Sequence, residues 1–326
     1  MENWGLITFR ETAMLYHEDE STSANKMATI AVIAHEITHM WFGNLVTCKW
    51  WSDLWLNEAF ASYLEYAAVE SVETTWNYFD LFLMTDTLSA LTADSSATSH
   101  PIVRPVREPE ERAYTSAIVY NKGASVLRML EFVMGTTSFQ KALTAYIKAN
   151  EYNVVETVQL WDELEKENNH AATIKIHDLM DSWTTKAGFP YLNISRLDPT
   201  TVWSVPFSYY KSLKPQKLPH LEFITKKEET ITVETDASLN GLLKINTNSE
   251  GFYLVNYPEE DWGKWIDALV NDQNSILSDL TVSDRTNFII DSFYLSRAGL
   301  LSYETPLALS EYLKREKHLT PWSVAI

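Results

Sequence analysis

Residues 33–66 read IAHEITHMWFGNLVTCKWWSDLWLNEAFASYLEY, and this stretch decides how the first half of the chain folds. Apolar residues recur at helical spacing over residues 21–46 and again over residues 52–70, which predicts two helices joined by a short connection. The first opens with Ser and Thr cap candidates, and Ser52 or Asp53 is the candidate cap of the second.

The polar residues in these two helices have a spacing that suits a metal ion. His35 and His39 are four residues apart, so in a helix both imidazoles stand on one face, one turn apart. That separation lets both reach one zinc ion at about 2.0–2.1 Å. The alternative is two ordinary helices whose histidines are satisfied core residues. Two histidines beside the acidic Glu36 are harder to bury without a partner, which favours the metal site.

A catalytic zinc needs a third protein ligand and a position for water. Glu58 lies on the second predicted helix, after a connection long enough to turn back, and is the candidate third ligand. Glu36 follows His35 directly and is rotated about 100° around the helix axis, where it suits a general base better than a ligand. Ser62, one turn beyond Glu58, is either a hydrogen-bond partner for a ligand or an ordinary surface serine.

The composition excludes several other classes of protein. The 326 residues are 45% apolar, and 12 Trp, 16 Tyr and 13 Phe supply core material for about two domains. A formal charge of -18 argues against a nucleic-acid-binding surface. The single cysteine, Cys48, excludes an intrachain disulfide framework and is expected to be a small buried apolar residue. The chain opens without a signal peptide, and its longest apolar stretch is too short to span a membrane. The start is abrupt and the end, HLTPWSVAI, follows a helical run without a turn or polar tail, so we expect a piece of a longer protein.

The pattern of the chain changes twice. Residues 23–187 are mostly helical, apart from a loop expected over 92–112. Short alternating segments with β-branched and aromatic residues follow from Pro190 to about residue 258 and favour a small β-sandwich. Helical periodicity returns after residue 259.

The segment HEITHMWFGNLVTCKWWSDLWLNEAF resembles the zinc signature of the aminopeptidase N family, the gluzincin metallopeptidases. That family includes alanyl and glutamyl aminopeptidases and leukotriene-A hydrolase. Its pattern, His-Glu-x-x-His, eighteen residues, then Glu, fits His35, Glu36, His39 and Glu58. The resemblance extends along nearly the whole chain. Cys48 and Ala59 depart from it, since Met and Gly are common at these positions in relatives.

Two more segments are similar to motifs of that family. The opening Met1-Glu2-Asn3 resembles the end of its Gly-Ala-Met-Glu-Asn motif, which implies that Glu2 binds the α-ammonium of the substrate. The segment AIVYNKGASVLRML resembles its Tyr-x-Lys-Gly-Ala segment and implies that Tyr120 donates a hydrogen bond to the developing oxyanion. Lys122 and Gly123 are expected to be structural.

The resemblance implies an α+β multidomain fold. Its parts would be a mostly helical, thermolysin-like zinc peptidase domain over residues 1–188, with its N-terminal part missing; a β-sandwich over 189–258; and the beginning of an α-helical C-terminal domain over 259–326.

The implied activity is that of an aminopeptidase of the EC 3.4.11 class, which holds one zinc ion and releases single residues from peptides with a free N-terminus. The alternatives are a cell-surface receptor ectodomain with little activity and an epoxide hydrolase similar to leukotriene-A hydrolase. We expect a plasma-membrane or extracellular location, with a cytoplasmic one as the alternative. Membrane attachment would require segments outside this sequence, and the full-length protein could form a homodimer.

Overall fold

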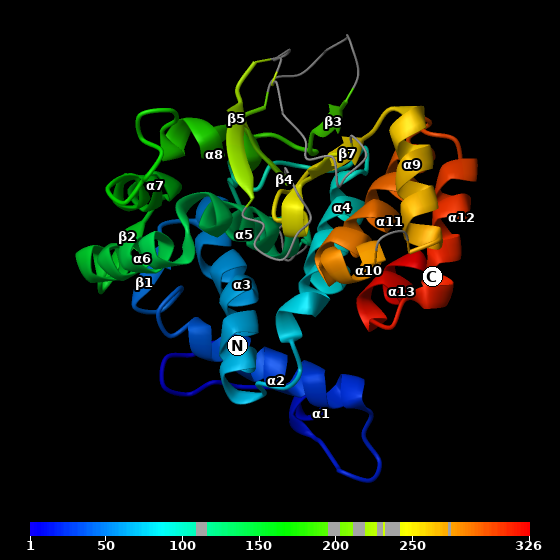
Figure 1. Cartoon of the computed structure of the whole chain (residues 1–326). Helices are drawn as coiled ribbons and strands as arrows, with labels where there is room; N and C mark the ends of the chain where they lie inside the picture. The colour runs from blue at the N-terminus through cyan, green and yellow to red at the C-terminus, as the bar shows by residue number, and fades with distance from the viewer. Residues whose placement is uncertain (109–115, 195–202, 211–218, 227–230, 232–241, 273–274) are drawn as a thin grey trace. The chain divides into compact units, whose positions relative to one another are not determined.

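A computed structural model describes the chain except for residues 109–115, 195–202, 211–218, 227–230, 232–241 and 273–274 (Figure 1). The chain divides into two compact units, one of residues 1–82 and 89–188 and the other of residues 83–88 and 189–326. Helices dominate both units and the sheets are small, as expected for an α+β protein. The division into three domains stays a prediction. Within the described residues, no helix combines the length and the apolar character needed to cross a membrane.

The first unit is built around one buried helix. Helix α3 (Trp55–Val72) packs against α2 (Ser23–Thr38) on one side and α5 (Gly123–Met134) on another. Residues 55–63 are buried without a break, so this part of α3 has no solvent face. Its aromatic residues pack against rings from outside the helix, Phe60 against Phe42 and Trp55 against Trp161. Polar side chains on such a helix have to be satisfied inside the unit.

The start of α2 follows the sequence prediction, whereas the start of α3 does not. Thr22 caps α2 in a reciprocal arrangement with Asn25. Helix α3 follows the 3-10 helix η1 (Trp51–Asp53) and its first turn has no side-chain cap. The carboxylate of Asp53 instead accepts hydrogen bonds from the backbone N–H and the hydroxyl of Thr157, at 2.9 and 2.6 Å. The prediction of Ser52 or Asp53 as the α3 cap was therefore wrong, because Asp53 accepts hydrogen bonds from the first residue of another helix.

The remaining elements of the first unit surround α2, α3 and α5. Strand β1 (Val46–Cys48) pairs in parallel with β2 (Asn153–Val155). Helix α2 ends at Thr38 and the chain then turns into β1, so the helix predicted over 21–46 is shorter than its apolar pattern. The other elements are α1 (Glu11–Met14), η2 (Tyr78–Leu81), α4 (Leu88–Asp94), η4 (Ile118–Lys122), α6 (Thr136–Asn150), α7 (Thr157–Glu165) and α8 (Ile176–Thr185).

The second unit contains the strands predicted after Pro190. Strand β4 (Val205–Tyr210) lies between β5 (His220–Ile224) and β6 (Lys244–Ile245) in an antiparallel sheet. A second, parallel pair joins β3 (Tyr191–Asn193) to β7 (Leu254–Asn256). Parts of the predicted strand segments fall on residues 195–202, 227–230 and 232–241, outside the described residues.

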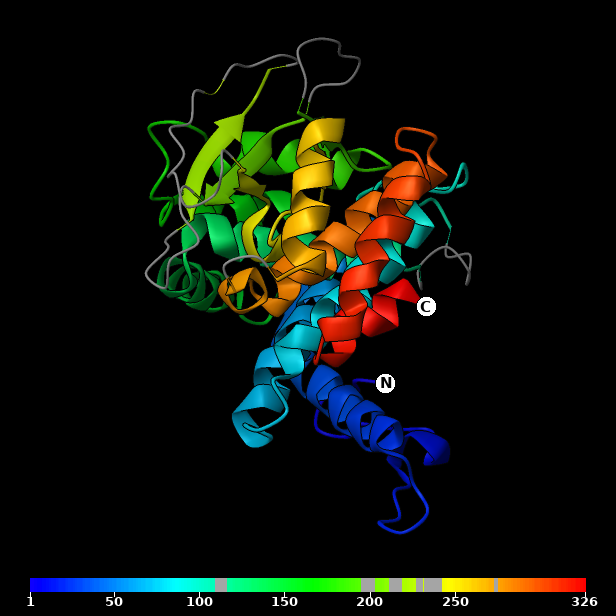
Figure 2. The same ribbon diagram turned by 45° about the vertical axis from the view of Figure 1, so that its right-hand side comes forward.

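Helices of the same unit follow the strands. Helix α11 (Val282–Arg297) packs against α12 (Glu304–Ser310) and α13 (Leu319–Ala325), drawn in orange and red in Figure 2. The aromatic core includes Trp265 and Phe288, whose ring centroids are 4.8 Å apart. The other elements of this unit are the π-helix η3 (Leu83–Thr87), η6 (Thr247–Ser249), α9 (Glu259–Val270), α10 (Ile276–Asp279) and η8 (Glu311–Arg315).

Candidate metal centre

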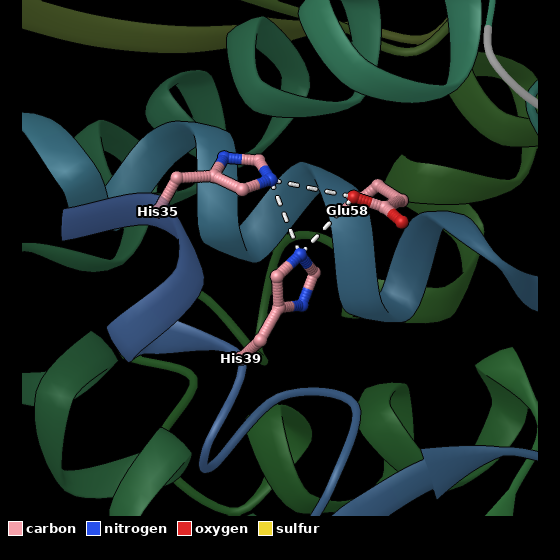
Figure 3. A group of neighbouring side chains, drawn as sticks. All are labelled: His35, His39 and Glu58. Carbon is pink, nitrogen blue, oxygen red and sulfur yellow. Dashed lines mark hydrogen bonds and ion pairs between the residues drawn. The ribbon is translucent and has the colours of Figure 1, made fainter. Parts of the chain in front are cut away.

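Three side chains from α2 and α3 point their donor atoms at one spot (Figure 3). The Nε2 atoms of His35 and His39 are 3.1 Å apart, and Glu58 Oε2 lies 3.4 Å from the first and 3.2 Å from the second. Two donors at about 2.0–2.1 Å from one tetrahedral zinc ion lie about 3.3 Å apart, so the triangle has the right size for zinc. Among the residues that the structure describes, only these three form a group of metal-ligand side chains that could share an ion.

The local backbone explains how His39 is aimed. Helix α2 ends at Thr38, and His39 keeps a helical conformation as its C-cap. The chain then turns through Gly43, whose φ of +129° is open to glycine and strained for other residues. The turn brings the Phe42 carbonyl to His39 Nδ1 at 2.9 Å, so Nδ1 carries the proton and Nε2 is free for a metal. A Cβ atom on Gly43 would lie 3.2 Å from that same Nδ1, which makes this a close approach of backbone to ligand.

His35 is held from the opposite side by a second carboxylate. Its Nδ1 lies 3.1 Å from Glu65 Oε2, while its Nε2 faces Glu58. Glu65 follows Glu58 by two helical turns, so both carboxylates project from the same face of α3. The sequence prediction considered Ser62 for such a role and overlooked Glu65. Ser62 is buried in α3, and in the described part of the chain the two imidazoles contact Glu65, Glu58 and the Phe42 carbonyl instead.

The electrostatics of the three residues favour a cation. Burial lowers the pKa of His35, but its hydrogen bonds to Glu58 and Glu65 outweigh burial and raise the pKa to about 9. Burial raises the pKa of Glu58, but its contacts with His35 and His39 outweigh that effect and lower the pKa to about 2. A carboxylate that stays ionised inside the unit, with a proton held beside it, is a place where a metal cation can replace the proton.

Glu36 follows His35 on α2 and is not one of the three residues that share the donor triangle. Its side chain is 12% exposed, and Oε1 lies 2.9 Å from the α-amino nitrogen of Met1. The other oxygen, Oε2, is buried and has no hydrogen-bond partner among the described residues. A buried carboxylate oxygen with free lone pairs can accept a proton or a hydrogen bond from a further molecule.

Tyr120 reaches the same region from a π-helical turn. The turn η4 (Ile118–Lys122) includes a hydrogen bond from the backbone N–H of Lys122 to the Ala117 carbonyl at 2.9 Å, and such turns are frequent at functional sites. The Tyr120 ring lies parallel to the His35 ring, with centroids 6.2 Å apart. Burial and the negative charge of Glu58 raise the pKa of Tyr120 well above its usual value, so the phenol keeps its proton near neutral pH.

Glu2 is held at the edge of this group of side chains. The Asn44 side chain, just after α2, donates a hydrogen bond to the Glu2 carbonyl at 2.6 Å. The charges of Glu2 and Glu36 both contribute to the raised pKa of Tyr120, which means that both carboxylates lie close to the phenol. The structure therefore brings together the predicted site residues His35, Glu36, His39, Glu58, Tyr120 and Glu2.

Lys122 and Gly123 support the turn that carries Tyr120. Lys122 is fully buried, pairs with Asp94 at 2.8 Å, and donates to the carbonyls of Lys186 and Gly188. Burial lowers the pKa of this ammonium group. A Cβ atom on Gly123 would lie only 2.5 Å from Ala59 Cβ, so the glycine allows α5 to approach α3 next to Glu58.

Comparison with known proteins shows the family of the chain. A family model described as the peptidase family M1 domain matches residues 1–183. The chain belongs to peptidase family M1. The resemblance predicted from the zinc signature is thus confirmed for the family. A second model, the ERAP1-like C-terminal domain, matches residues 242–326 of this M1 family member.

Individual relatives match over the whole M1 chain. Glutamyl aminopeptidase of Bos taurus is 40% identical over 346 residues, which cover 99% of this chain and 35% of the bovine protein. Aminopeptidase N of Rattus norvegicus is 37% identical over 355 residues, covering 100% of this chain and 36% of the rat protein. Glutamyl aminopeptidase of Homo sapiens is 37% identical over 349 residues, which cover 100% of this chain and 35% of the human protein. The chain therefore spans about a third of the length of these relatives.

Proposed function

We propose that this chain carries the metal centre of a zinc aminopeptidase that releases single N-terminal residues from peptides. The observation that carries the proposal is the convergence of His35, His39 and Glu58, whose donor atoms are 3.1–3.4 Å apart. Membership of the M1 family and the names of the relatives support a peptidase rather than a receptor or an epoxide hydrolase. A plasma-membrane or extracellular location belongs to the same proposal.

The residues fit a zinc ion with an open fourth position. His35 and His39 would supply imidazole nitrogens and Glu58 a carboxylate oxygen, and three protein ligands are typical of catalytic rather than structural zinc. When bound, zinc polarises a carbonyl group and lowers the pKa of water from about 16 towards about 7.

Glu36 is assigned the proton transfers. Its Oε2 atom is buried without a partner among the described residues, and the residue directly follows the candidate ligand His35 on α2. It would take a proton from the attacking water and then give that proton to the amine of the leaving peptide. The C–N bond breaks as the new C–O bond is completed, and the enzyme forms no covalent intermediate.

Tyr120 and Glu2 are assigned the binding of two groups of the N-terminal substrate residue, its carbonyl oxygen and its α-ammonium group. The phenol of Tyr120 keeps its proton and would donate a hydrogen bond to the carbonyl oxygen as this becomes negative. The Glu2 carboxylate would pair with the α-ammonium group of the peptide. Fixing that ammonium at one distance from the metal restricts cleavage to the first peptide bond.

The test uses the complete protein with aminoacyl p-nitroanilides. We expect hydrolysis that a chelator abolishes and zinc restores, and no hydrolysis when the amino group of the substrate is acetylated. Glu36→Gln should keep one zinc ion per chain and lose activity by a factor of about 100 or more. A Glu36→Gln protein that holds zinc and hydrolyses at the wild-type rate would contradict the assignment of the base.

A further inference from the structure

We propose that Glu65 is a positioning residue for the metal centre, which fixes the His35 imidazole and strengthens its nitrogen as a zinc ligand. The inference rests on the proposed zinc site, and its test has a readout that does not depend on peptide hydrolysis. Its basis is the contact between Glu65 Oε2 and His35 Nδ1 at 3.1 Å.

Two carboxylates of helix α3 face the two ring nitrogens of His35. Glu58 and Glu65 are seven residues apart on α3, so they project from one face about 10 Å apart along the axis. His35 lies on α2, which packs against α3. Its Nε2 faces Glu58 and its Nδ1 faces Glu65, so the ring is held between two carboxylates of one rigid element.

A hydrogen bond from Nδ1–H to Glu65 has two effects on Nε2. It selects the tautomer that leaves the Nε2 lone pair free, and it stops rotation of the ring away from the ligand position. A negatively charged acceptor also makes the imidazole more basic, which a neutral carbonyl does less. The side chains of His35 and Glu65 are only 14% and 16% exposed, so water screens this contact weakly.

The two histidines therefore differ in the group that accepts a hydrogen bond from Nδ1. His39 Nδ1 donates to the neutral Phe42 carbonyl, which orients the ring. His35 has a full carboxylate in the equivalent place. The loss of Glu65 should thus weaken one ligand in both orientation and basicity, whereas Glu65→Gln keeps an acceptor oxygen and removes only the charge.

A purely structural role for Glu65 would be to join α2 to α3, and the same helix pair provides a control. Lys26 of α2 pairs with Glu73 at the end of α3, with 3.5 Å between Nζ and Oε1. Lys26 precedes His35 by nine residues, about 13 Å along the helix. Glu73→Gln therefore removes a carboxylate that joins these helices without approaching the metal ligands.

The experiment measures the zinc dissociation constant of the complete protein by competition with a chromophoric chelator. We expect Glu65→Ala to bind zinc about 10–100-fold more weakly than wild type, Glu65→Gln about tenfold more weakly, and Glu73→Gln equally well. The visible spectrum of the Co²⁺-substituted protein should change in the Glu65 variants and remain unchanged in Glu73→Gln. Circular dichroism checks that each variant is folded, and Glu65→Gln decides the test where Glu65→Ala does not fold.

Two outcomes would overturn the inference. In the first, folded Glu65→Gln and Glu65→Ala bind zinc within twofold of wild type. In the second, Glu73→Gln weakens binding as much as Glu65→Gln, which would make the effect one of helix packing. Failure of the wild-type protein to bind zinc would overturn the proposed metal site itself, so the two failures can be told apart.

Discussion

Close contact between Gly123 and Ala59 gives a sharp prediction about the packing beneath the metal centre. A Cβ atom on residue 123 would lie 2.5 Å from Ala59 Cβ, whereas carbon atoms in contact prefer about 3.5–4.0 Å. Gly123→Ala therefore has to separate α5 and the π-helical turn from α3 by about 1 Å. We expect a destabilisation of about 1–3 kcal/mol, the usual cost of overpacking.

The neighbouring residue allows the reasoning to be checked by a double-mutant cycle. Ala59→Gly removes the methyl group that Gly123→Ala would meet, and alone should cost about 1 kcal/mol through its lower helix propensity. In the double variant the methyl group only moves from one helix to the other. We therefore expect the double variant to lie within about 1 kcal/mol of wild type, with a coupling energy of about 1–3 kcal/mol.

The assay is urea unfolding of the zinc-free protein, followed by tryptophan fluorescence, together with the zinc dissociation constant of each variant. Gly123→Ala should also weaken zinc binding, because Ala59 directly follows the ligand Glu58 on α3. Ala59→Gly/Gly123→Ala should restore both properties. Strict additivity of the two single changes would refute the claim that these residues limit the approach of the helices.

Two further predictions concern the buried Lys122–Asp94 pair and the half-buried thiol of Cys48. Lys122→Met should destabilise the protein by about 3–5 kcal/mol in urea unfolding, because it leaves Asp94 buried without its partner at 2.8 Å. Lys122→Met/Asp94→Leu should recover only part of the loss, because it removes both charges but also the hydrogen bonds to the Lys186 and Gly188 carbonyls and from the Gly188 N–H. No recovery would contradict the pairing of the two charges. Burial and the charge of Asp53 raise the pKa of Cys48 to about 12, so at pH 8 only about one native thiol in ten thousand is ionised. Alkylation by iodoacetamide at pH 8 should thus be at least about a thousandfold slower in the native protein than in urea, and comparable rates would contradict the raised pKa.

Local periodicity predicted the elements of the site better than their ends. Helices α2 and α3 lie where the apolar spacing placed them, because burial of their apolar faces determines where they form. Their ends depend on partners that are distant in sequence, which periodicity does not contain. Asp53 illustrates this, since it bonds to Thr157 and leaves the start of α3 uncapped.

The sequence predicted the three candidate ligands, but only some of the groups that hold their side chains in place. The spacing of His35 and His39 fixes their relative position in any helix, and the family pattern supplied Glu58. Glu65 could have been found as well, because residues seven apart on a helix share a face. The Phe42 carbonyl could not, since a backbone acceptor has no residue type of its own and depends on the turn at Gly43.

Other features lacked any local pattern. The π-helical turn around Tyr120 adds one residue to a helix without changing the apolar spacing on either side. Helix α13 lies in the region predicted to be helical, but its bounds were not predicted, because Pro321 in its third position suggests the end of a helix although proline is tolerated in a first turn. Strands β1 and β2 are three residues each, too short to show alternation within a helical region.

The central claim is that two imidazoles and one carboxylate hold a single zinc ion. X-ray absorption of the complete, zinc-loaded protein tests it most directly. The account predicts one zinc ion per chain, with nitrogen and oxygen neighbours at about 2.0–2.1 Å, two of them imidazoles, and loss of the ion in His39→Ala and Glu58→Ala. Zinc with sulfur neighbours at about 2.3 Å, or zinc retained with unchanged neighbours in both variants, would contradict it.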